Sequence, residues 1–209
     1  MNIYDNIDEI IYINLESRND RDIEIRKLFD LYFPDKKITR VSACTINNIN
    51  LKLLKYKKID ITCTPGVIGC YYSHIIQLHK LYEKYKNTKK DTYVLIFEDD
   101  TNISPEFINK LKEPFTLKNW NIILGINDIC NINKNEINLY ETGKYKIFGT
   151  NIVIYNLKNI KEIYMKMINL NRIKDYDFML FNNIDNLYFF DTKYIFENKK
   201  TSKSDIRNE

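Results

Sequence analysis

The sequence lacks the paired cysteines on which many zinc and redox sites depend. Its four cysteines are Cys44, Cys63, Cys70 and Cys130, and no two of them form a CxxC pair. Zinc ribbons and dithiol redox sites commonly use such pairs. We therefore expect free thiols, in a protein that resides in a reducing compartment.

Long hydrophobic runs and a strong charge of one sign are also absent. No stretch approaches the roughly 18 consecutive apolar residues of a membrane span, and residues 1–9 lack the basic and apolar regions of a secretory signal. We expect a cytoplasmic protein with no membrane span. Lys and Arg total 32 and Asp and Glu total 28, so the formal net charge is only +4. This small charge argues against a dedicated nucleic-acid binder.

Aromatic residues are plentiful, with 16 tyrosines and 11 phenylalanines, while glycine and proline are scarce. Hydrophobic residues make up 44% of the chain and charged residues 29%, which is typical of a globular protein. A chain of 209 residues supports one domain of ordinary size. We expect one domain with an aromatic-rich core over residues 1–198 and a polar tail over residues 199–209. Nothing in the sequence indicates an oligomeric state.

Strand patterns alternate with helix patterns along this domain. Apolar runs predict strands at residues 9–15, 37–42, 93–97, 120–126, 147–155 and 187–190. Helical spacing and capping signals predict helices from 19 to before Pro34, at 64–86, from 104, at 157–170 and at 175–181. A hairpin turn is predicted at 140–145, and residues 45–61 are a loop or a marginal helix. The alternation predicts an α/β fold with a mostly parallel central sheet flanked by helices.

Three acids, Glu98, Asp99 and Asp100, directly follow the apolar run at residues 93–97. Ligands of parallel α/β sheets bind at the carboxyl ends of strands. Adjacent carboxylates repel one another unless a cation or a basic group lies nearby. Mg²⁺ and Mn²⁺ prefer oxygen ligands and share them with substrate phosphates, so few carboxylates suffice. We predict Glu98 and Asp100 as metal ligands, because residues two apart can share a face; the alternative is a helix-capping or surface acidic turn.

An apolar strand that ends in acids also occurs in P-loop NTPases. That class requires a GxxxxGK[ST] motif, and none of the five glycines begins one. ATP hydrolysis by that route is therefore excluded.

Four further segments stand in a specific order along the chain. They are INLESRNDR at residues 13–21, RVSA at 40–43, GVIGCYYSH at 66–74 and FEDD at 97–100. Taken together, they resemble glycosyltransferase family 25, the family of bacterial lipopolysaccharide-core and collagen galactosyltransferases. Gly149-Thr150, Asp175-Tyr176-Asp177 and Ser204-Asp205-Ile206 also match, so the resemblance covers nearly the whole chain.

The resemblance implies a GT-A-type fold and a specific reaction. A hexose, galactose or glucose, would move with inversion from a UDP-sugar to a hydroxyl of a glycan, lipopolysaccharide or protein acceptor. Mn²⁺ or Mg²⁺ would assist at the acidic motif. The residues that it favours at the donor site are Asn14, Arg18, Gly69, Ser73, His74 and Asp99.

Several of these residues have an ordinary alternative. At the first strand end, Asn14 can bind a base or ribose and Arg18 a diphosphate, or the two can form a capped turn with a surface arginine. Arg21 has the same two alternatives, ligand binding or a surface position. Arg40 can bind a ligand or form a salt bridge at the sheet edge. Gly66 and Gly69 permit close backbone approach to an anion near a helix start. A lone helical histidine such as His74 is otherwise a structural hydrogen-bonding residue.

Asp175 and Asp177 open a short predicted helix, where acids often serve only as caps. The rival interpretation makes Asp177 the general base, with Asp175 next in line, because inverting transfer needs a carboxylate that takes the acceptor proton.

Two other functions compete with an active transferase. The first is an inactive module that binds a nucleotide sugar or glycan, suggested by Asn151-Ile152-Val153 where many members of the family have His-Ala-Tyr. The intact acidic triplet argues against it. The second, a nucleic-acid or phosphoprotein binder using the lysines between residues 52 and 58, has weak charge support.

Overall fold

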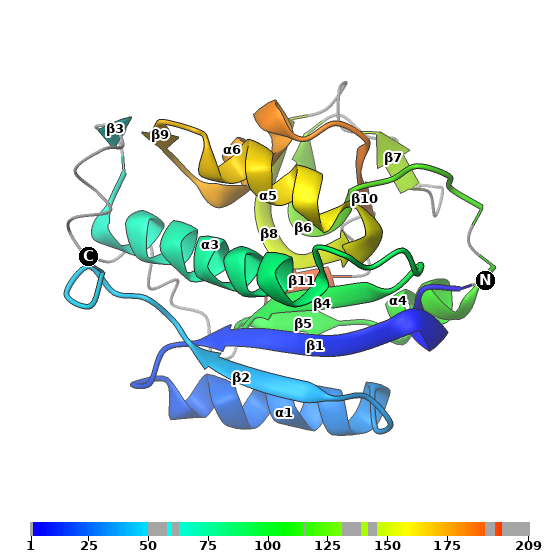
Figure 1. Ribbon diagram of the computed structural model, residues 1–209. Helices are drawn as coiled ribbons and strands as arrows, with labels where there is room; N and C mark the ends of the chain where they lie inside the picture. The colour runs from blue at the N-terminus through cyan, green and yellow to red at the C-terminus, as the bar shows by residue number, and fades with distance from the viewer. Residues whose placement is uncertain are drawn as a thin grey trace.

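The computed structural model describes residues 2–49, 58–59, 63–114, 116–130, 139–141, 146–190 and 195–197 (Figure 1). The strands are β1 (Ile7–Asn14), β2 (Ile38–Ser42), β3 (Lys58–Ile59), β4 (Tyr93–Glu98), β5 (Thr101–Ile103), β6 (Ile122–Cys130), β7 (Leu139–Glu141), β8 (Lys146–Asn156), β9 (Arg172–Ile173), β10 (Leu187–Phe190) and β11 (Ile195–Glu197). The helices are α1 (Asn19–Tyr32), α3 (Pro65–Tyr85), α4 (Pro105–Lys112), α5 (Ile160–Ile168) and α6 (Tyr176–Asn183), with 3-10 turns η1 (Tyr4–Asn6) and η3 (Leu157–Asn159). The predicted tail at 199–209 lies outside the described residues.

The central sheet has seven strands in the order β2-β1-β4-β8-β6-β10-β7. Strands β2, β1, β4, β6 and β10 run in one direction, and β8 and β7 run in the other. The expected α/β class is confirmed, although the sheet is mixed because β8 lies antiparallel between β4 and β6. The predicted strand at 187–190 is β10, and β7 pairs with it at the edge of the sheet. Of the predicted hairpin turn at 140–145, residues 140 and 141 belong to β7, and residues 142–145 lie outside the described residues.

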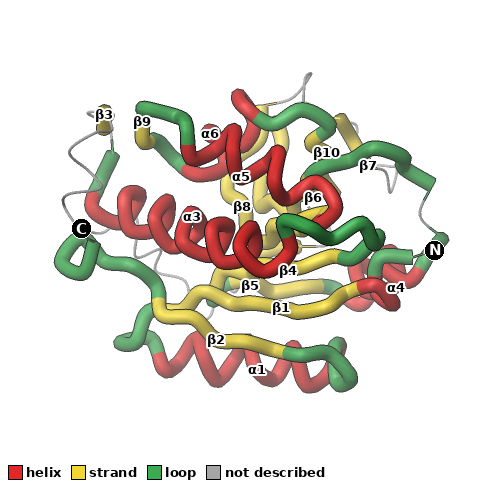
Figure 2. The backbone as a smooth tube through the Cα atoms, viewed as in Figure 1, coloured by secondary structure: helices red, strands yellow, loops and turns green. Residues whose placement is uncertain are grey.

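Both faces of the sheet are covered, which explains why its strands read as continuous apolar runs. Helices α3, α5 and α6 cover one face, and α1 and α4 the other (Figures 1 and 2). Alternate residues of each strand point to opposite faces. One core contains Ile11, Ile13, Val94, Ile96, Ile122, Leu124, Val153 and Tyr155, and the other contains Ile10, Tyr12, Leu95, Phe97, Ile123, Ile152 and Ile154. Each such buried side chain contributes roughly 1.5–3 kcal/mol to folding.

The two predicted helix caps are present. The Thr64 hydroxyl accepts from the Val67 amide at the start of α3, and the Ser104 hydroxyl accepts from the Phe107 amide at the start of α4. Each cap precedes a proline at the first helical position, which needs no amide partner. The Thr64 cap fixes where α3 begins, and the first turn of α3 reaches the pocket described below.

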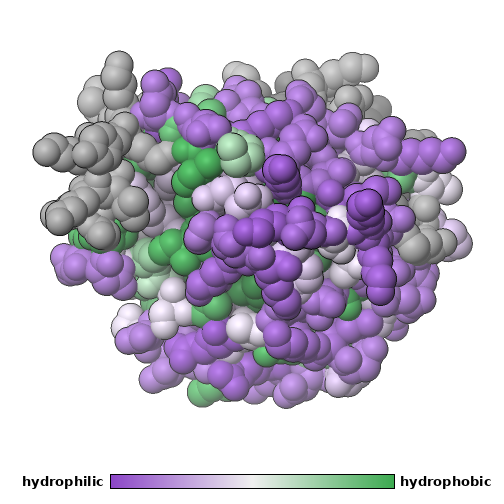
Figure 3. Space-filling model, viewed as in Figure 1, coloured by the Kyte–Doolittle hydropathy of each residue, from purple (hydrophilic) through white to green (hydrophobic). Residues whose placement is uncertain are grey.

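The surface formed by the described residues carries few large apolar side chains. The face in Figure 3 is mostly hydrophilic, with smaller hydrophobic areas between the charged residues. Exposed large hydrophobic side chains in the described part are Ile23, Leu31, Ile76, Met165 and Phe178. No helix among the described residues is long and apolar enough to cross a membrane.

A buried carboxylate ties the first strand to its neighbours. The Glu9 side chain is only 8% exposed, accepts a hydrogen bond from Thr39, and pairs with Lys37 at 2.8 Å and Lys84 at 3.0 Å. Burial alone would raise the pKa of Glu9, but the hydrogen bonds from Lys37, Thr39 and Lys84 outweigh it and lower the pKa to about 2.

We expect Glu9 to make the fold acid-sensitive. Its pKa is depressed from 4.5, so its contribution is complete above about pH 5 and is lost as the pH falls toward 2. Because the Lys37 and Lys84 side chains are 63% and 48% exposed, we expect about 1–2 kcal/mol rather than the full value of the shift. In urea titrations, Glu9→Gln should be less stable at pH 7 and should lose less stability than wild type between pH 5 and 3. Glu83→Gln, at an exposed pair with Lys86, is the control; an equal change there would contradict the assignment.

Candidate functional site

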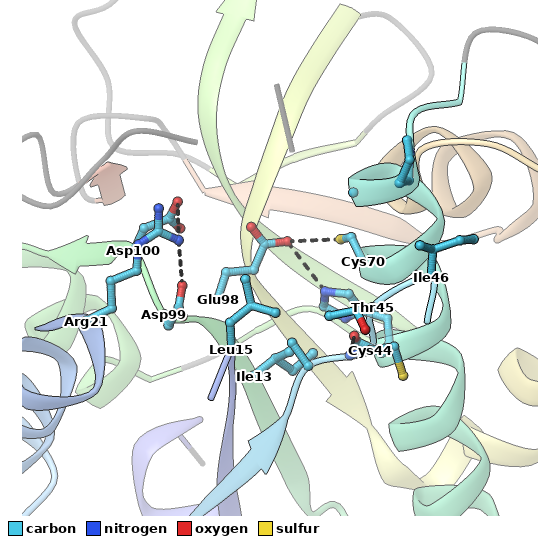
Figure 4. Close-up of a pocket in the computed structure, with 15 residues that line it drawn as sticks. Ile13, Leu15, Arg21, Cys44, Thr45, Ile46, Cys70, Glu98, Asp99 and Asp100 are labelled. Atoms are coloured by element: carbon cyan, nitrogen blue, oxygen red, sulfur yellow. Dashed lines mark hydrogen bonds and ion pairs between the residues drawn. The ribbon is translucent and has the colours of Figure 1, made fainter. Parts of the chain in front are cut away.

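A pocket opens where β1 and β4 end and α3 begins. The space between its walls, open solvent included, is about 730 Å³. Its lining is Ile13, Leu15, Arg21, Ala43, Cys44, Thr45, Ile46, Pro65, Gly66, Cys70, Ser73, His74, Glu98, Asp99 and Asp100 (Figure 4). The carboxyl ends of the strands therefore do converge on a hollow, as expected for this class of sheet.

The acidic triplet divides between two sides of this pocket. Glu98 points toward α3, whereas Asp99 and Asp100 point toward Arg21 on α1 (Figure 4). Successive residues at a strand end alternate in direction, and the chain turns after Glu98 at the end of β4. Glu98 and Asp100 were predicted to share a face. Their side chains point in different directions, although both carboxylates line the same pocket.

Arg21 is the positive group that the clustered carboxylates require. Its Nη1 atom lies 2.9 Å from Asp99 Oδ1 and 3.6 Å from Asp100 Oδ2, and its side chain is 5% exposed. Asp99 also accepts a hydrogen bond from Asn14 Nδ2 at 2.7 Å. Both Asp99 oxygens therefore already have partners within the protein, and Asp99 positions its neighbours.

Asn14, a predicted donor-site residue, is fully buried and lies outside the pocket lining. Its amide nitrogen donates to Asp99 and to the Arg18 carbonyl, and its amide oxygen accepts from Arg40 Nε and Nη2 at 3.0 and 2.6 Å. Arg40 therefore binds this amide, and it also lies 3.4 Å from Asp22. The chain Arg40–Asn14–Asp99–Arg21 joins β2, β1, β4 and α1 beneath the pocket.

Glu98 faces two residues of α3. Its Oε1 atom lies 3.7 Å from Cys70 Sγ and 3.5 Å from His74 Nε2. Burial first, and then the nearby charges of Asp177 and Asp99, raise the pKa of Glu98 to about 8, against the smaller lowering effects of the Cys70 hydrogen bond and Arg21. Without a bound cation, this carboxyl group is therefore easily protonated near neutral pH.

His74 and Ser73 lie side by side in α3 but contact different partners. The His74 ring is 1% exposed and stacks on Tyr176 of α6 at a centroid distance of 4.4 Å. Burial lowers the pKa of His74 to about 4, against a smaller opposing effect of Asp177, so the ring is neutral. The Ser73 hydroxyl donates to the Gly69 carbonyl and accepts from the Cys44 amide at 2.7 Å. Ser73 thereby holds the loop after β2 against α3.

Gly69 and Arg18, also predicted at the donor site, lie outside the pocket lining. A Cβ atom on Gly69 would collide with the Cys44 backbone carbonyl, so its small size serves the contact between helix and loop. Arg18 pairs with Asp20 at 2.8 Å near the surface. Gly66, by contrast, lines the pocket at the start of α3, where backbone amides favour an anion.

The two proposed bases differ in their surroundings. Asp175 is exposed and is the N-cap residue of α6, but its side chain makes no capping hydrogen bond. Asp177 is half buried in the first turn, and its charge raises the pKa values of Glu98, His74 and Cys70. Asp177 is thus near the α3 side of the pocket, although it is not among the lining residues.

The donor chemistry of the pocket fits a hard divalent cation. Glu98 and Asp100 both bring carboxylate oxygens to it, while Asp99 is engaged with Asn14 and Arg21. Mg²⁺ and Mn²⁺ need only one or two protein carboxylates when a substrate supplies phosphate oxygens. Glu98 and Asp100 are therefore the residues that could hold such an ion together with a diphosphate.

Sequence reasoning underestimated two pocket residues. Arg21 was left undecided, yet it is the buried partner of both aspartates. Cys70 was treated only as a free thiol, although it is four residues before His74 on one helix. That i, i+4 spacing places two side chains on the same face of a helix, which is a signal already present in the sequence.

Comparisons with known proteins agree with the sequence motifs. A model of the family described as glycosyltransferase family 25 (LPS biosynthesis protein) matches residues 7–203. No curated protein matches the chain. Among solved structures, it is similar to a glycosyltransferase involved in the glycosylation of the major capsid of PBCV-1, with 8% identity, a TM-score of 0.44, and coverage of 88% of this chain and 81% of that chain. It is also similar to mouse xyloside xylosyltransferase 1 in its apo form, with 10% identity, a TM-score of 0.37, and coverage of 85% and 68%.

Both structural likenesses are too distant to indicate what this protein acts on. The family match is of a different kind, because it spans nearly the whole chain and includes every segment that forms the pocket. The chain therefore belongs to glycosyltransferase family 25.

Proposed function

We propose that this glycosyltransferase moves a hexose, galactose or glucose, from a UDP-sugar to a hydroxyl of a glycan, lipopolysaccharide or protein acceptor, with inversion and with Mn²⁺ or Mg²⁺. The observation that carries the proposal is the convergence of Arg21, Glu98, Asp100 and the start of α3 on one pocket. A diphosphate needs positive partners, and here these are a guanidinium, the amides of a helix start and a bound cation.

When bound, the cation would neutralise the charge that develops on the departing diphosphate. The protein supplies the remaining features. Arg21 lines the pocket beside Asp100 and can share its guanidinium between the aspartates and a phosphate. The buried chain from Asn14 to Asp99 keeps Arg21 in place, which limits the loss of freedom on binding.

Acceptor activation requires a base. In the proposed reaction the acceptor oxygen attacks the anomeric carbon as the bond to the diphosphate breaks, and Asp177 takes the acceptor proton. Two observations support this role for Asp177. It is half buried and close to Glu98, His74 and Cys70, and it does not belong to the acidic triplet. A base outside the metal site keeps its basicity.

The segment that differs from many family members does not favour the inactive alternative. Asn151 is 2% exposed, and its backbone carbonyl accepts a hydrogen bond from Thr101. Ile152 and Val153 are fully buried in the two cores. All three lie outside the pocket lining, so the difference is one of packing in β8.

The proposal predicts that donor binding depends on a metal held by Asp100. In calorimetric titrations, wild-type protein should bind UDP-sugars at least about tenfold more tightly with Mn²⁺ than after chelation, which is about 1.4 kcal/mol. Asp100→Asn should remove that difference, because the metal bridges this carboxylate and the diphosphate. Asp91→Asn is the matched control, since Asp91 is exposed and precedes β4 at its opposite end. Full binding and turnover after chelation would refute the proposed metal.

A further inference from the structure

Three side chains with different donor atoms converge on the α3 side of the pocket. Cys70 Sγ, an imidazole nitrogen of His74 and a carboxylate oxygen of Glu98 all lie within 4.8 Å of one another. Cys70 and His74 are one helical turn apart. Glu98 points toward Cys70 from the end of β4 (Figure 4), and its Oε1 atom lies 3.5 Å from His74 Nε2. A helix and a strand thus bring together a thiol, an imidazole and a carboxylate that are distant in sequence.

The two ring nitrogens of His74 are buried polar atoms that the described residues leave unsatisfied. The side chain is 1% exposed, yet neither Nδ1 nor Nε2 has a hydrogen-bond partner among those residues. A carboxylate atom, Glu98 Oε1, lies 3.5 Å from Nε2 without hydrogen-bond geometry. Buried polar atoms are normally satisfied, because an unmet one costs roughly 1–3 kcal/mol. A ligand that takes a lone pair from the imidazole would remove this cost.

The spacing of the three groups suits a small tetrahedral ion. With Zn–S bonds near 2.3 Å and Zn–N and Zn–O bonds near 2.0–2.2 Å, ligand atoms around Zn²⁺ lie roughly 3.3–3.7 Å apart. The distances here are 3.7 Å from Cys70 Sγ to Glu98 Oε1 and 3.5 Å from His74 Nε2 to Glu98 Oε1. The third pair, Cys70 Sγ and a ring nitrogen of His74, lies within 4.8 Å, so a side-chain movement of about 1 Å at most would complete such a site.

We propose that Cys70, His74 and Glu98 form a Zn²⁺ site with a fourth position open to the pocket. On binding, the Cys70 thiol gives its proton to water and coordinates as a thiolate, while His74 binds as the neutral imidazole. Sulfur and nitrogen ligands favour Zn²⁺ over Mn²⁺ or Mg²⁺, which prefer oxygen. Three protein ligands and one open position are the pattern of sites that admit water or a substrate.

This site differs from the oxygen site of the proposed function, although both use Glu98. The two ions compete for that carboxylate, whereas Cys70 belongs only to the Zn²⁺ site and Asp100 only to the other. The inference does not rest on sugar transfer, so it can be tested without a nucleotide sugar.

The test uses the full chain, freed of metal, with Zn²⁺ alone in calorimetry and Co²⁺ alone as a spectroscopic probe. Wild-type protein should bind one Zn²⁺, and Co²⁺ should produce a thiolate-to-metal charge-transfer band. Cys70→Ser should abolish the band and weaken Zn²⁺ at least about tenfold. Cys44→Ser should keep both, because this cysteine lines the same pocket without joining the cluster.

His74→Phe adds a second measurement, since it preserves a ring against Tyr176 and removes both nitrogens; its thermal melt shows whether it folds. Unchanged Zn²⁺ affinity in Cys70→Ser, a band that survives it, or no stoichiometric Zn²⁺ in wild type would overturn the site. Measuring Mn²⁺-dependent UDP-sugar binding distinguishes failure of the Zn²⁺ site from failure of the proposed transferase function. If Cys70→Ser keeps this binding but loses Zn²⁺, the Zn²⁺ site is supported. If wild-type protein lacks this binding, only the proposed transferase function is contradicted.

Discussion

Asp177→Asn is expected to slow sugar transfer by on the order of 10² to 10⁴ while donor and metal binding stay nearly unchanged. That range is the usual contribution of a positioned proton acceptor. The asparagine keeps the size of the side chain and cannot take a proton. The charge of Asp177 acts on both Glu98 and His74: it helps to raise the pKa of Glu98 and partly opposes the lowering of the His74 pKa by burial. Helix α6, which carries Asp177, packs against α3. The measurement is single-turnover transfer together with UDP-sugar calorimetry.

Three outcomes separate the possible roles of Asp177. Loss of Mn²⁺-dependent binding would assign it to the donor site, and the base would then be sought first at Asp175. A lower melting temperature with unchanged turnover would make it a structural residue of α6. Asp175→Asn is the matched control two residues away, because Asp175 is exposed and makes no capping hydrogen bond. A large loss of turnover from that variant alone would reverse the assignment.

Arg21→Met should destabilise the fold by roughly 3–5 kcal/mol, the usual cost of removing one partner from a buried ion pair. Methionine fills much of the space but leaves Asp99, whose side chain is 8% exposed, without its cation. The free energy of unfolding in urea measures this loss. Arg18→Met is the control on the same turn, because Arg18 pairs with Asp20, which is half exposed. Such surface pairs contribute about 0–1 kcal/mol.

A double substitution shows whether the charge or the packing matters. Arg21→Met with Asp99→Asn removes both charges, so it should recover part of the stability lost in Arg21→Met alone. Equal losses in the single and double variants would mean that Arg21 acts through its volume. A loss in Arg21→Met no larger than that in Arg18→Met would remove Arg21 from the base of the pocket.

The local elements could be predicted because their signals are local. The first helix was expected to start at Asn19 and end before Pro34, and α1 spans Asn19–Tyr32. Thr64-Pro65 and Ser104-Pro105 carry their own caps. Strands β5 and β9 were not predicted, because two or three residues show no periodicity. The antiparallel direction of β8 was not predictable either, since an apolar run covered on both faces looks the same in either direction.

The site was predicted at the level of segments and less well at the level of atoms. The acidic motif and the Gly66–His74 segment do meet at one pocket, as the family resemblance implied. Asn14 and Gly69, however, contact protein groups there: the amide of Asn14 bonds to Asp99 and Arg40, and Gly69 lies against the Cys44 carbonyl. A sequence motif does not show whether a residue contacts the ligand or holds neighbouring protein groups in place. Whether Arg18, Ser73 and His74 contact the donor stays a prediction.

Sequence patterns were sufficient to predict the α/β class, the boundaries of the main helices, the family and the chain segments that carry the chemistry. These depend on side-chain periodicity, caps and motifs, which act over a few neighbouring residues. The directions of the acidic side chains depend on tertiary packing: Glu98 turns toward Cys70 and His74, while Asp99 and Asp100 turn toward Arg21. These hydrogen bonds join residues 28 to 85 positions apart. The packing of the helices on the sheet selects such partners, because a buried charge requires a partner nearby.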